Sequence, residues 1–168
     1  MTIRLPDKMT VAGAEIRILL AECSTPAQPG YSLALAKTAM QYMDAVLWNR
    51  VKNPKPYGAK SGATLIDIIK APKQFAGFES YPNYASTIRN RIQMCLDIAN
   101  DSKDSRNAAY TAFVNAAIER TAAEAVEDPS PGDLVGWRTA GRGSPGPAFK
   151  EYATVLGNTF FWIANNSG

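Results

Sequence analysis

The sequence contains no histidine among its 168 residues. This absence excludes Ser-His-Asp and Cys-His catalysis, zinc sites of the His-Glu-x-x-His type and every imidazole general base. Acid–base chemistry must therefore use carboxylates, lysine, tyrosine or cysteine. The remaining residues show no metal-ligand spacing, and we expect the chain to use neither a metal nor an organic cofactor.

Cysteine is nearly as scarce, with Cys23 and Cys95 as the two examples. Two cysteines can form one disulfide, but cysteine is also among the residue types most often buried in a protein core. We therefore expect two small buried apolar side chains, with a single disulfide as the alternative.

Long apolar runs are missing as well. No segment approaches the ~20 apolar residues of a membrane span, and Pro6, Asp7 and Glu15 interrupt the start, where a signal peptide would need an apolar run. The 18 basic and 15 acidic residues give a net charge of +3, without a basic run typical of nucleic-acid binding. We expect neither membrane insertion nor a nucleic-acid partner.

What the sequence does contain is helical periodicity, as in Ile16, Leu19, Leu20 and Cys23, which fall on one helical stripe. Similar stripes predict helices over residues 10–23, 32–52, 65–70, 84–100 and 105–127. The Pro- and Gly-rich segments 54–64 and 128–149 predict irregular structure, and the β-branched and aromatic segment 153–163 predicts a strand or a packed tail. The expected fold is mainly α (α+β), one domain over residues 1–168, with a small β-hairpin near 55–63 and a further β element at the C-terminus.

Glu22 is the unusual residue in this pattern, because it ends the first predicted helix, where the helix dipole does not favour an anion. A carboxyl group held near apolar surface at a helix C-terminus has a raised pKa, which is what a general acid needs at neutral pH. On these residues alone, a solvated glutamate at a frayed helix end is the simpler interpretation.

Residues 18–54, followed by residues 65–78, resemble the cell-wall hydrolases of the spore-cortex lytic type, which share a lysozyme-like fold. In that family a helix ends in a glutamate, here Glu22, and a second helix ends in an Asn-Arg-Val turn, here residues 49–51. A short apolar segment then leads to a Gln-Phe pair, which Gln74 and Phe75 match.

The resemblance resumes near the end of the chain. Residues 128–141 are similar to the family's Asp-Pro-Thr-Gly-Gly-Ala stretch, with Trp137 as its aromatic residue but without the Asn-Pro that follows it. Residues 155–162 are similar to the closing Gly-Asn-His-x-Phe-Tyr motif, with Thr159 in place of the histidine. The matched pieces cover about half of the chain in the family's order.

The resemblance implies a peptidoglycan glycoside hydrolase that cleaves a β-1,4 bond with Glu22 as the catalytic acid. An N-acetylglucosaminidase is the first choice, with a muramidase or a lytic transglycosylase as alternatives. The second role in the reaction falls to Asp67, to Glu79 or to the 2-acetamido group of the sugar. For the two carboxylates, a helix-side polar residue and a solvated loop charge are the simpler interpretations.

Two kinds of side chain are expected to bind the sugar. The candidates for hydrogen bonds to N-acetyl and hydroxyl oxygens are Ser61, Gln74 and Asn158. The candidates for flat faces against the sugar rings are Tyr31, Phe75 and Trp137, for which core packing is the alternative.

A wall hydrolase without a signal peptide needs an export route, and the chain resembles the glycoside hydrolase effectors of bacterial type VI secretion. It is then expected to be made in the cytoplasm, secreted, and active as an antibacterial toxin in the periplasm of a target cell. Its partners would be the peptidoglycan glycan strand and a cognate immunity protein that occludes the cleft. The alternatives are a phage endolysin, a non-catalytic peptidoglycan-binding module and a helical adaptor.

Overall fold

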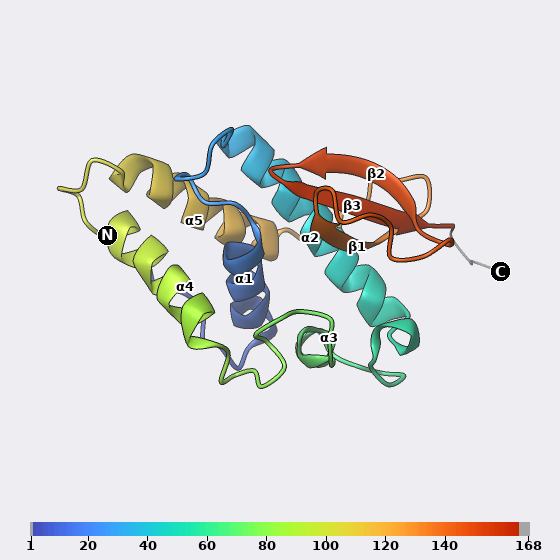
Figure 1. Cartoon of the computed structure of the whole chain (residues 1–168). Coiled ribbons are helices and arrows are strands. Elements are labelled where there is room, and N and C mark those ends of the chain that lie inside the picture. The colour runs from blue at the N-terminus through green and yellow to red at the C-terminus, as the bar shows by residue number, and fades with distance from the viewer. Residues whose placement is uncertain (1, 165–168) are drawn as a thin grey trace.

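The computed structural model describes residues 2–164, which form five α-helices, one short 3₁₀ helix and a three-stranded antiparallel sheet (Figure 1). The elements are α1 Val11–Glu22, α2 Leu33–Lys52, η1 Lys55–Tyr57, α3 Leu65–Lys70, α4 Ser86–Ala99, α5 Asn107–Ala122, β1 Asp133–Thr139, β2 Lys150–Val155 and β3 Asn158–Ile163. The prediction of a mainly α chain with a small β element is confirmed. No helix of this described part is long and apolar enough to cross a membrane.

Local capping explains where the first three helices begin. The Thr10 hydroxyl accepts a hydrogen bond from the Gly13 amide, and the Ser32 hydroxyl accepts one from the Leu35 amide. Thr64 and Asp67 form a reciprocal capping box at the start of α3. Each of these bonds satisfies an amide that the helix itself leaves free, so short polar residues fix the helix starts.

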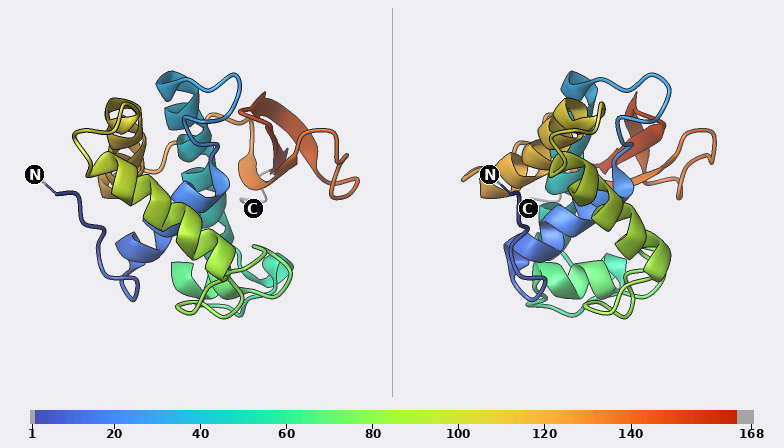
Figure 2. Two further views of the ribbon diagram at one scale, coloured as in Figure 1. Left: turned by 60° about the vertical axis from the view of Figure 1, so that its left-hand side comes forward. Right: turned by 90° about the vertical axis from the view of Figure 1, so that its left-hand side faces the viewer.

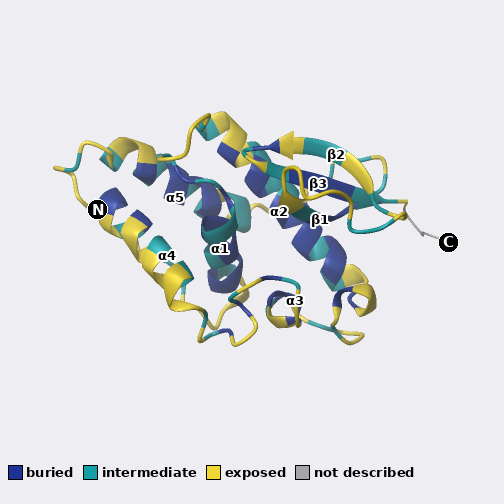
Figure 3. Cartoon of the chain, viewed as in Figure 1, coloured by how far each residue is buried: buried dark blue, intermediate teal, exposed yellow. Residues whose placement is uncertain are grey.

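The helices surround α1, which packs against α3, α4 and α5, while α2 lies between α5 and the sheet (Figures 1 and 2). Burial follows this arrangement, because α1 and the middle of α2 are dark in Figure 3 while the outer face of α4 is exposed. The sheet is therefore attached to the helical part mainly through α2 and β1.

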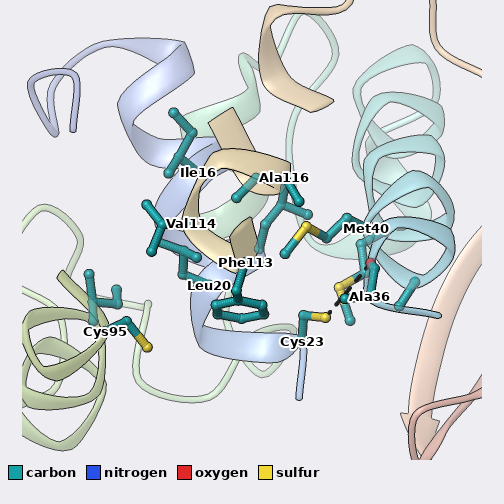
Figure 4. Packing of buried hydrophobic residues seen from close by; sticks show 14 of the residues in the cluster. Ile16, Leu20, Cys23, Ala36, Met40, Cys95, Phe113, Val114 and Ala116 are labelled. Carbon is teal, nitrogen blue, oxygen red and sulfur yellow. Dashed lines mark hydrogen bonds between the residues drawn. The ribbon is translucent and has the colours of Figure 1, made fainter. Parts of the chain in front are cut away.

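The main core gathers side chains from α1, α2, α4, α5 and the sheet. Figure 4 shows how those of the helices pack together. Cys23 and Cys95 belong to this core, and both are buried and free. The Cys23 thiol lies beside the Ala36 carbonyl, 3.9 Å away, whereas Cys95 lies on α4. The prediction of two buried apolar cysteines is confirmed.

The sheet has the strand order β1-β3-β2. A two-residue turn joins β2 to β3, with φ of 46° at Leu156 and 80° at Gly157. Positive φ at both central positions is the geometry of the tight hairpin turn whose twist matches that of the strands, and glycine adopts it without strain.

The predicted hairpin near 55–63 is wrong. Hydrogen bonds from the Tyr57 amide to the Pro54 carbonyl and from the Gly58 amide to the Lys55 carbonyl close short turns instead. A chain that satisfies its amides locally has none left for a strand partner. The hairpin lies at the C-terminus, where residues 150–163 supply β-branched and aromatic side chains. The helix predicted to reach residue 127 ends at Ala122.

Candidate active site

Glu22 is the last residue of α1, because the next residue, Cys23, adopts an extended conformation. The Arg91 guanidinium on α4 donates hydrogen bonds to the Leu20 carbonyl, at 3.2 Å, and to the Cys23 carbonyl. These carbonyls belong to the helix end, where the helix supplies no donor of its own. Arg91 therefore stabilises the C-terminal end of α1, where the catalytic candidate Glu22 lies.

The Glu22 side chain is partly buried, and this burial is the main cause that raises the pKa of its carboxyl group above 4.5. The indole N–H of Trp137 and the positive charge of Arg91 act in the opposite direction and lower the pKa, but burial outweighs them. A raised pKa keeps part of the population protonated at higher pH, which is the state a general acid requires.

The Glu22 side chain lines a cleft of about 540 Å³ between the helices and the sheet. A volume of this size accommodates a small ligand or a short stretch of a polymer. The residues that line the cleft are Glu22, Arg50, Gln74, Phe75, Ala76, Trp137, Arg138, Thr139, Arg142 and Asn158. They come from α1, α2, the 74–76 segment, β1, the β1–β2 loop and β3.

One wall of the cleft is aromatic. The rings of Phe75 and Trp137 lie with centroids 5.4 Å apart and planes inclined by 41°. The Trp137 ring also contacts Phe160 in the core, with centroids 6.1 Å apart. Phe75 is buried in the core, as the alternative of core packing predicted, and it holds the partly buried Trp137 ring in place. The apolar face available to a sugar ring beside the carboxyl group is therefore mainly that of Trp137.

Arg50 connects this wall to α2. It is buried, lies over the rings of Tyr57 and Phe75, and donates from Nε to the Val135 carbonyl at 2.8 Å. Val135 has no partner in β3, because the strand register shifts between Leu134 and Gly136, so Arg50 supplies a donor to a bulged residue. Burial lowers the pKa of Arg50 to about 10.

Three further hydrogen bonds, made by Asn49 and Arg50 near the end of α2, order the site. Arg50 Nη1 donates to Gln74 Oε1 at 3.1 Å, which leaves the Gln74 amide nitrogen with one long contact, 3.5 Å from the Pro72 carbonyl. Asn49 donates to the Asp128 carboxylate and to the Leu134 carbonyl, both at 2.8 Å. The pair 49–50 thus ties α2 to β1 and orients the amide of Gln74.

The β2–β3 turn is attached to the end of α1. The Ser24 hydroxyl donates to the Leu156 carbonyl at 3.0 Å, and Asn158 Nδ2 lies 3.5 Å from the Glu22 carbonyl oxygen. These contacts bring the first residue of β3 to the cleft. Asn158 therefore lies beside the catalytic candidate although the two are far apart in the sequence.

Five of the residues predicted for the site lie together in this cleft: Glu22, Gln74, Phe75, Trp137 and Asn158. Ser61 does not line it, because it is exposed in a separate hollow of the 58–72 segment. Tyr31 does not line it either, because its ring packs edge-on against Phe113 and its hydroxyl is buried. Burial raises the pKa of Tyr31 to about 12.

The two alternative carboxylates lie outside the cleft. Asp67 is exposed and accepts a hydrogen bond from the Thr64 amide at 2.9 Å, and exposed Glu79 accepts one from the Gly77 amide at 3.0 Å. Glu22 is thus the one carboxyl group among the described residues that line the cleft. Within residues 2–164, no group of three or more acidic or cysteine side chains is placed to hold a metal ion.

Three arginines of the cleft, Arg50, Arg138 and Arg142, were not predicted as site residues. Arg50 belongs to the Asn-Arg-Val turn of the resemblance, which was a signal for it. Arg138 is the residue before the last of β1, and Arg142 lies in the glycine-rich loop beyond the strand. Neither falls in a basic run, so their convergence with Arg50 depends on the fold alone.

No family model matches the chain, and searches of curated proteins and of solved structures found no significant match. A function must therefore be inferred from the chemistry of the cleft and from the resemblance of its motifs.

Proposed function

We propose that the protein is a glycoside hydrolase of lysozyme-like type that cleaves a β-1,4 bond of the peptidoglycan glycan strand. The observation that carries the proposal is the Glu22 carboxyl group, partly buried, with a raised pKa, in a cleft walled by Phe75 and Trp137. Gln74 and Asn158 add amide groups that suit the N-acetyl and hydroxyl oxygens of the sugar.

In this mechanism the protonated Glu22 donates its proton to the glycosidic oxygen as the bond to the anomeric carbon breaks. The anomeric carbon then carries oxocarbenium character, and a water molecule supplies its hydroxyl group. The proton of that water returns to the Glu22 carboxylate, which restores the acid. Partial burial favours the protonated form at the start of the cycle.

Because Glu22 is the one carboxyl group that lines the cleft, the group that stabilises the anomeric carbon must come from elsewhere. Retaining and inverting enzymes with two carboxylates hold both beside the scissile bond, whereas Asp67 and Glu79 lie elsewhere. The 2-acetamido oxygen of the sugar is therefore our proposed stabiliser of the anomeric carbon. N-acetylglucosaminidase activity remains the first choice, on the strength of the motif resemblance.

The same observation favours lytic transglycosylation as the second candidate. One carboxyl group that acts first as acid and then as base is sufficient for that reaction, because the attacking hydroxyl belongs to the sugar itself. The product is then a 1,6-anhydro end in place of a reducing end. The delivery of the protein to a rival cell and its inhibition by an immunity protein stay predictions.

Digestion of purified sacculi followed by mass spectrometry of the soluble fragments tests the proposal. Reducing N-acetylglucosamine ends establish the glucosaminidase, reducing N-acetylmuramic acid ends a muramidase, and anhydro ends a transglycosylase. Fragments cut within the stem peptides, or no soluble fragments, would overturn the proposed function. Heat-denatured protein is the control for contaminating hydrolases.

A further inference from the structure

The cleft carries more positive charge than acid catalysis requires. Three guanidinium groups, from Arg50, Arg138 and Arg142, line it together with the single carboxyl group of Glu22. No ion pair within 4.0 Å joins any of these arginines to a carboxylate among the described residues. The positive charge of these arginines is therefore not paired with a carboxylate of the described residues, and it can attract an anionic ligand.

The three arginines differ in how many of their side-chain donors are already used in hydrogen bonds within the protein. Arg50 is buried and its donors serve the Val135 carbonyl and Gln74. Arg138 is exposed, with one contact at 3.5 Å to the Ser144 carbonyl, and Arg142 is exposed with no side-chain hydrogen bond among the described residues. Arg138 and Arg142 thus have most of their donors free at the cleft.

Their positions suit a binding role. Arg138 extends from β1 directly after Trp137, and Arg142 lies on the loop where the Arg142 amide bonds to the Thr139 carbonyl at 3.2 Å. This turn folds the loop back, so that both side chains border the same cleft. A guanidinium group presents several N–H donors in a planar fork that matches a carboxylate.

We propose that Arg138 and Arg142 bind a carboxylate of the glycan substrate and so make the cleft selective for acidic glycans over neutral N-acetylglucosamine polymers. The inference rests on the proposed function, because it places a glycan in the cleft. The carboxylate belongs either to the lactyl group of muramic acid or to the stem peptide attached to it. Both are carboxylates, and the same guanidinium chemistry recognises them.

The test is binding, measured by isothermal titration calorimetry in the Glu22→Gln background, so that no ligand is cleaved. Three tetrasaccharide probes separate the sources: neutral chitotetraose, the alternating N-acetylglucosamine–N-acetylmuramic acid form with free lactyl carboxylates, and that form carrying stem peptides. We expect at least one acidic probe to bind about tenfold or more tightly than chitotetraose. The tighter of the two acidic probes identifies the carboxylate.

The variant Arg138→Gln/Arg142→Gln should lose that preference and bind chitotetraose as before. The matched control is Arg4→Gln/Arg89→Gln, which removes two exposed positive charges outside the cleft and should keep the preference. Equal affinity for all three probes, or an equal loss in both double variants, would overturn the inference. A preserved preference with no cleavage of sacculi by the wild type would instead refute the proposed hydrolase and leave carboxylate recognition standing.

Discussion

Trp137 on β1 and Glu22 at the end of α1 line the same cleft, where the Trp137 side chain lowers the pKa of the Glu22 carboxyl group that burial raises. The two residues are far apart in the sequence and meet because α2 holds β1 against the helices. The tryptophan is thus both a wall of the cleft and a control on the acidity of the proposed catalytic group.

Replacing Trp137 by phenylalanine should move the alkaline limb of the pH–rate profile. A general acid is active when protonated, so activity falls as the pH rises through its pKa. Phenylalanine lacks the indole N–H that lowers the pKa of Glu22, so this pKa rises further and the alkaline limb of kcat/KM should shift to higher pH. Trp162→Phe, outside the cleft, is the control. An unmoved limb, or one shifted to lower pH, would contradict this role.

Asp67→Asn and Glu79→Gln should both leave the rate of sacculus digestion within about twofold of the wild type, because neither carboxylate lines the cleft and the side-chain oxygen of each amide can still accept the local hydrogen bond. Each carboxylate accepts a local amide hydrogen bond away from the cleft. A loss of a hundredfold or more in either variant would show that it takes part in the chemistry.

Arg50→Met should lower the free energy of unfolding by about 2–3 kcal/mol, measured by urea denaturation. The substitution keeps the aliphatic packing but leaves the buried Val135 carbonyl without its donor and frees the Gln74 amide. Lys52→Met, at an exposed position near the end of the same helix, should change stability little. Equal stability of the two variants would contradict the proposed linkage of α2 to β1.

Buried Glu15 gives the fold a pH dependence. Burial, the hydrogen bond to Asp44 and the charge of Asp44 raise the pKa of Glu15 to about 9, while the Trp48 indole, 3.3 Å away, and Arg120 lower it. Asp44 itself lies 3.2 Å from the Arg120 guanidinium. Burial beside a second carboxyl group thus favours the protonated form of Glu15.

The folded state therefore binds a proton that the unfolded chain releases above a pH of about 4.5. Stability from this group is fully present below that pH and declines as the pH rises toward about 9. Thermal unfolding between pH 5 and 9 should show this decline in the wild type and a flatter dependence in Glu15→Gln. The same slope in both proteins would show that Glu15 is not the group responsible.

Much of the helical architecture was predictable because its signals are local. Apolar periodicity and short polar caps, such as Ser32 and Thr64, act within one or two turns of the helix they start. The prediction of a hairpin near 55–63 was wrong for the opposite reason, because a strand is stabilised by a partner strand that local sequence patterns do not identify. The Pro- and Gly-rich composition of this segment suited tight local turns equally well.

Site residues that belong to sequence motifs could be predicted, whereas those that reach the cleft only through the folding of the chain could not. Gln74, Phe75, Trp137 and Asn158 were predicted from resembling motifs, and the structure places them around Glu22. Tyr31 was predicted to offer a flat face to a sugar ring, with core packing as the alternative, and its ring packs against Phe113 at the core. Arg138 and Arg142 reach the cleft through a β1–β2 loop whose path no local pattern reveals.

The most direct test of the central claim compares sacculus digestion by the wild type and by Glu22→Gln, with Glu79→Gln as a control that removes the same charge elsewhere. Glutamine keeps the size of the side chain but cannot donate the catalytic proton. We expect the release of soluble glycan to fall on the order of 10²–10⁴-fold in Glu22→Gln alone, with unfolding transitions unchanged. Undiminished release by a folded Glu22→Gln protein would contradict the assignment of Glu22 as the acid.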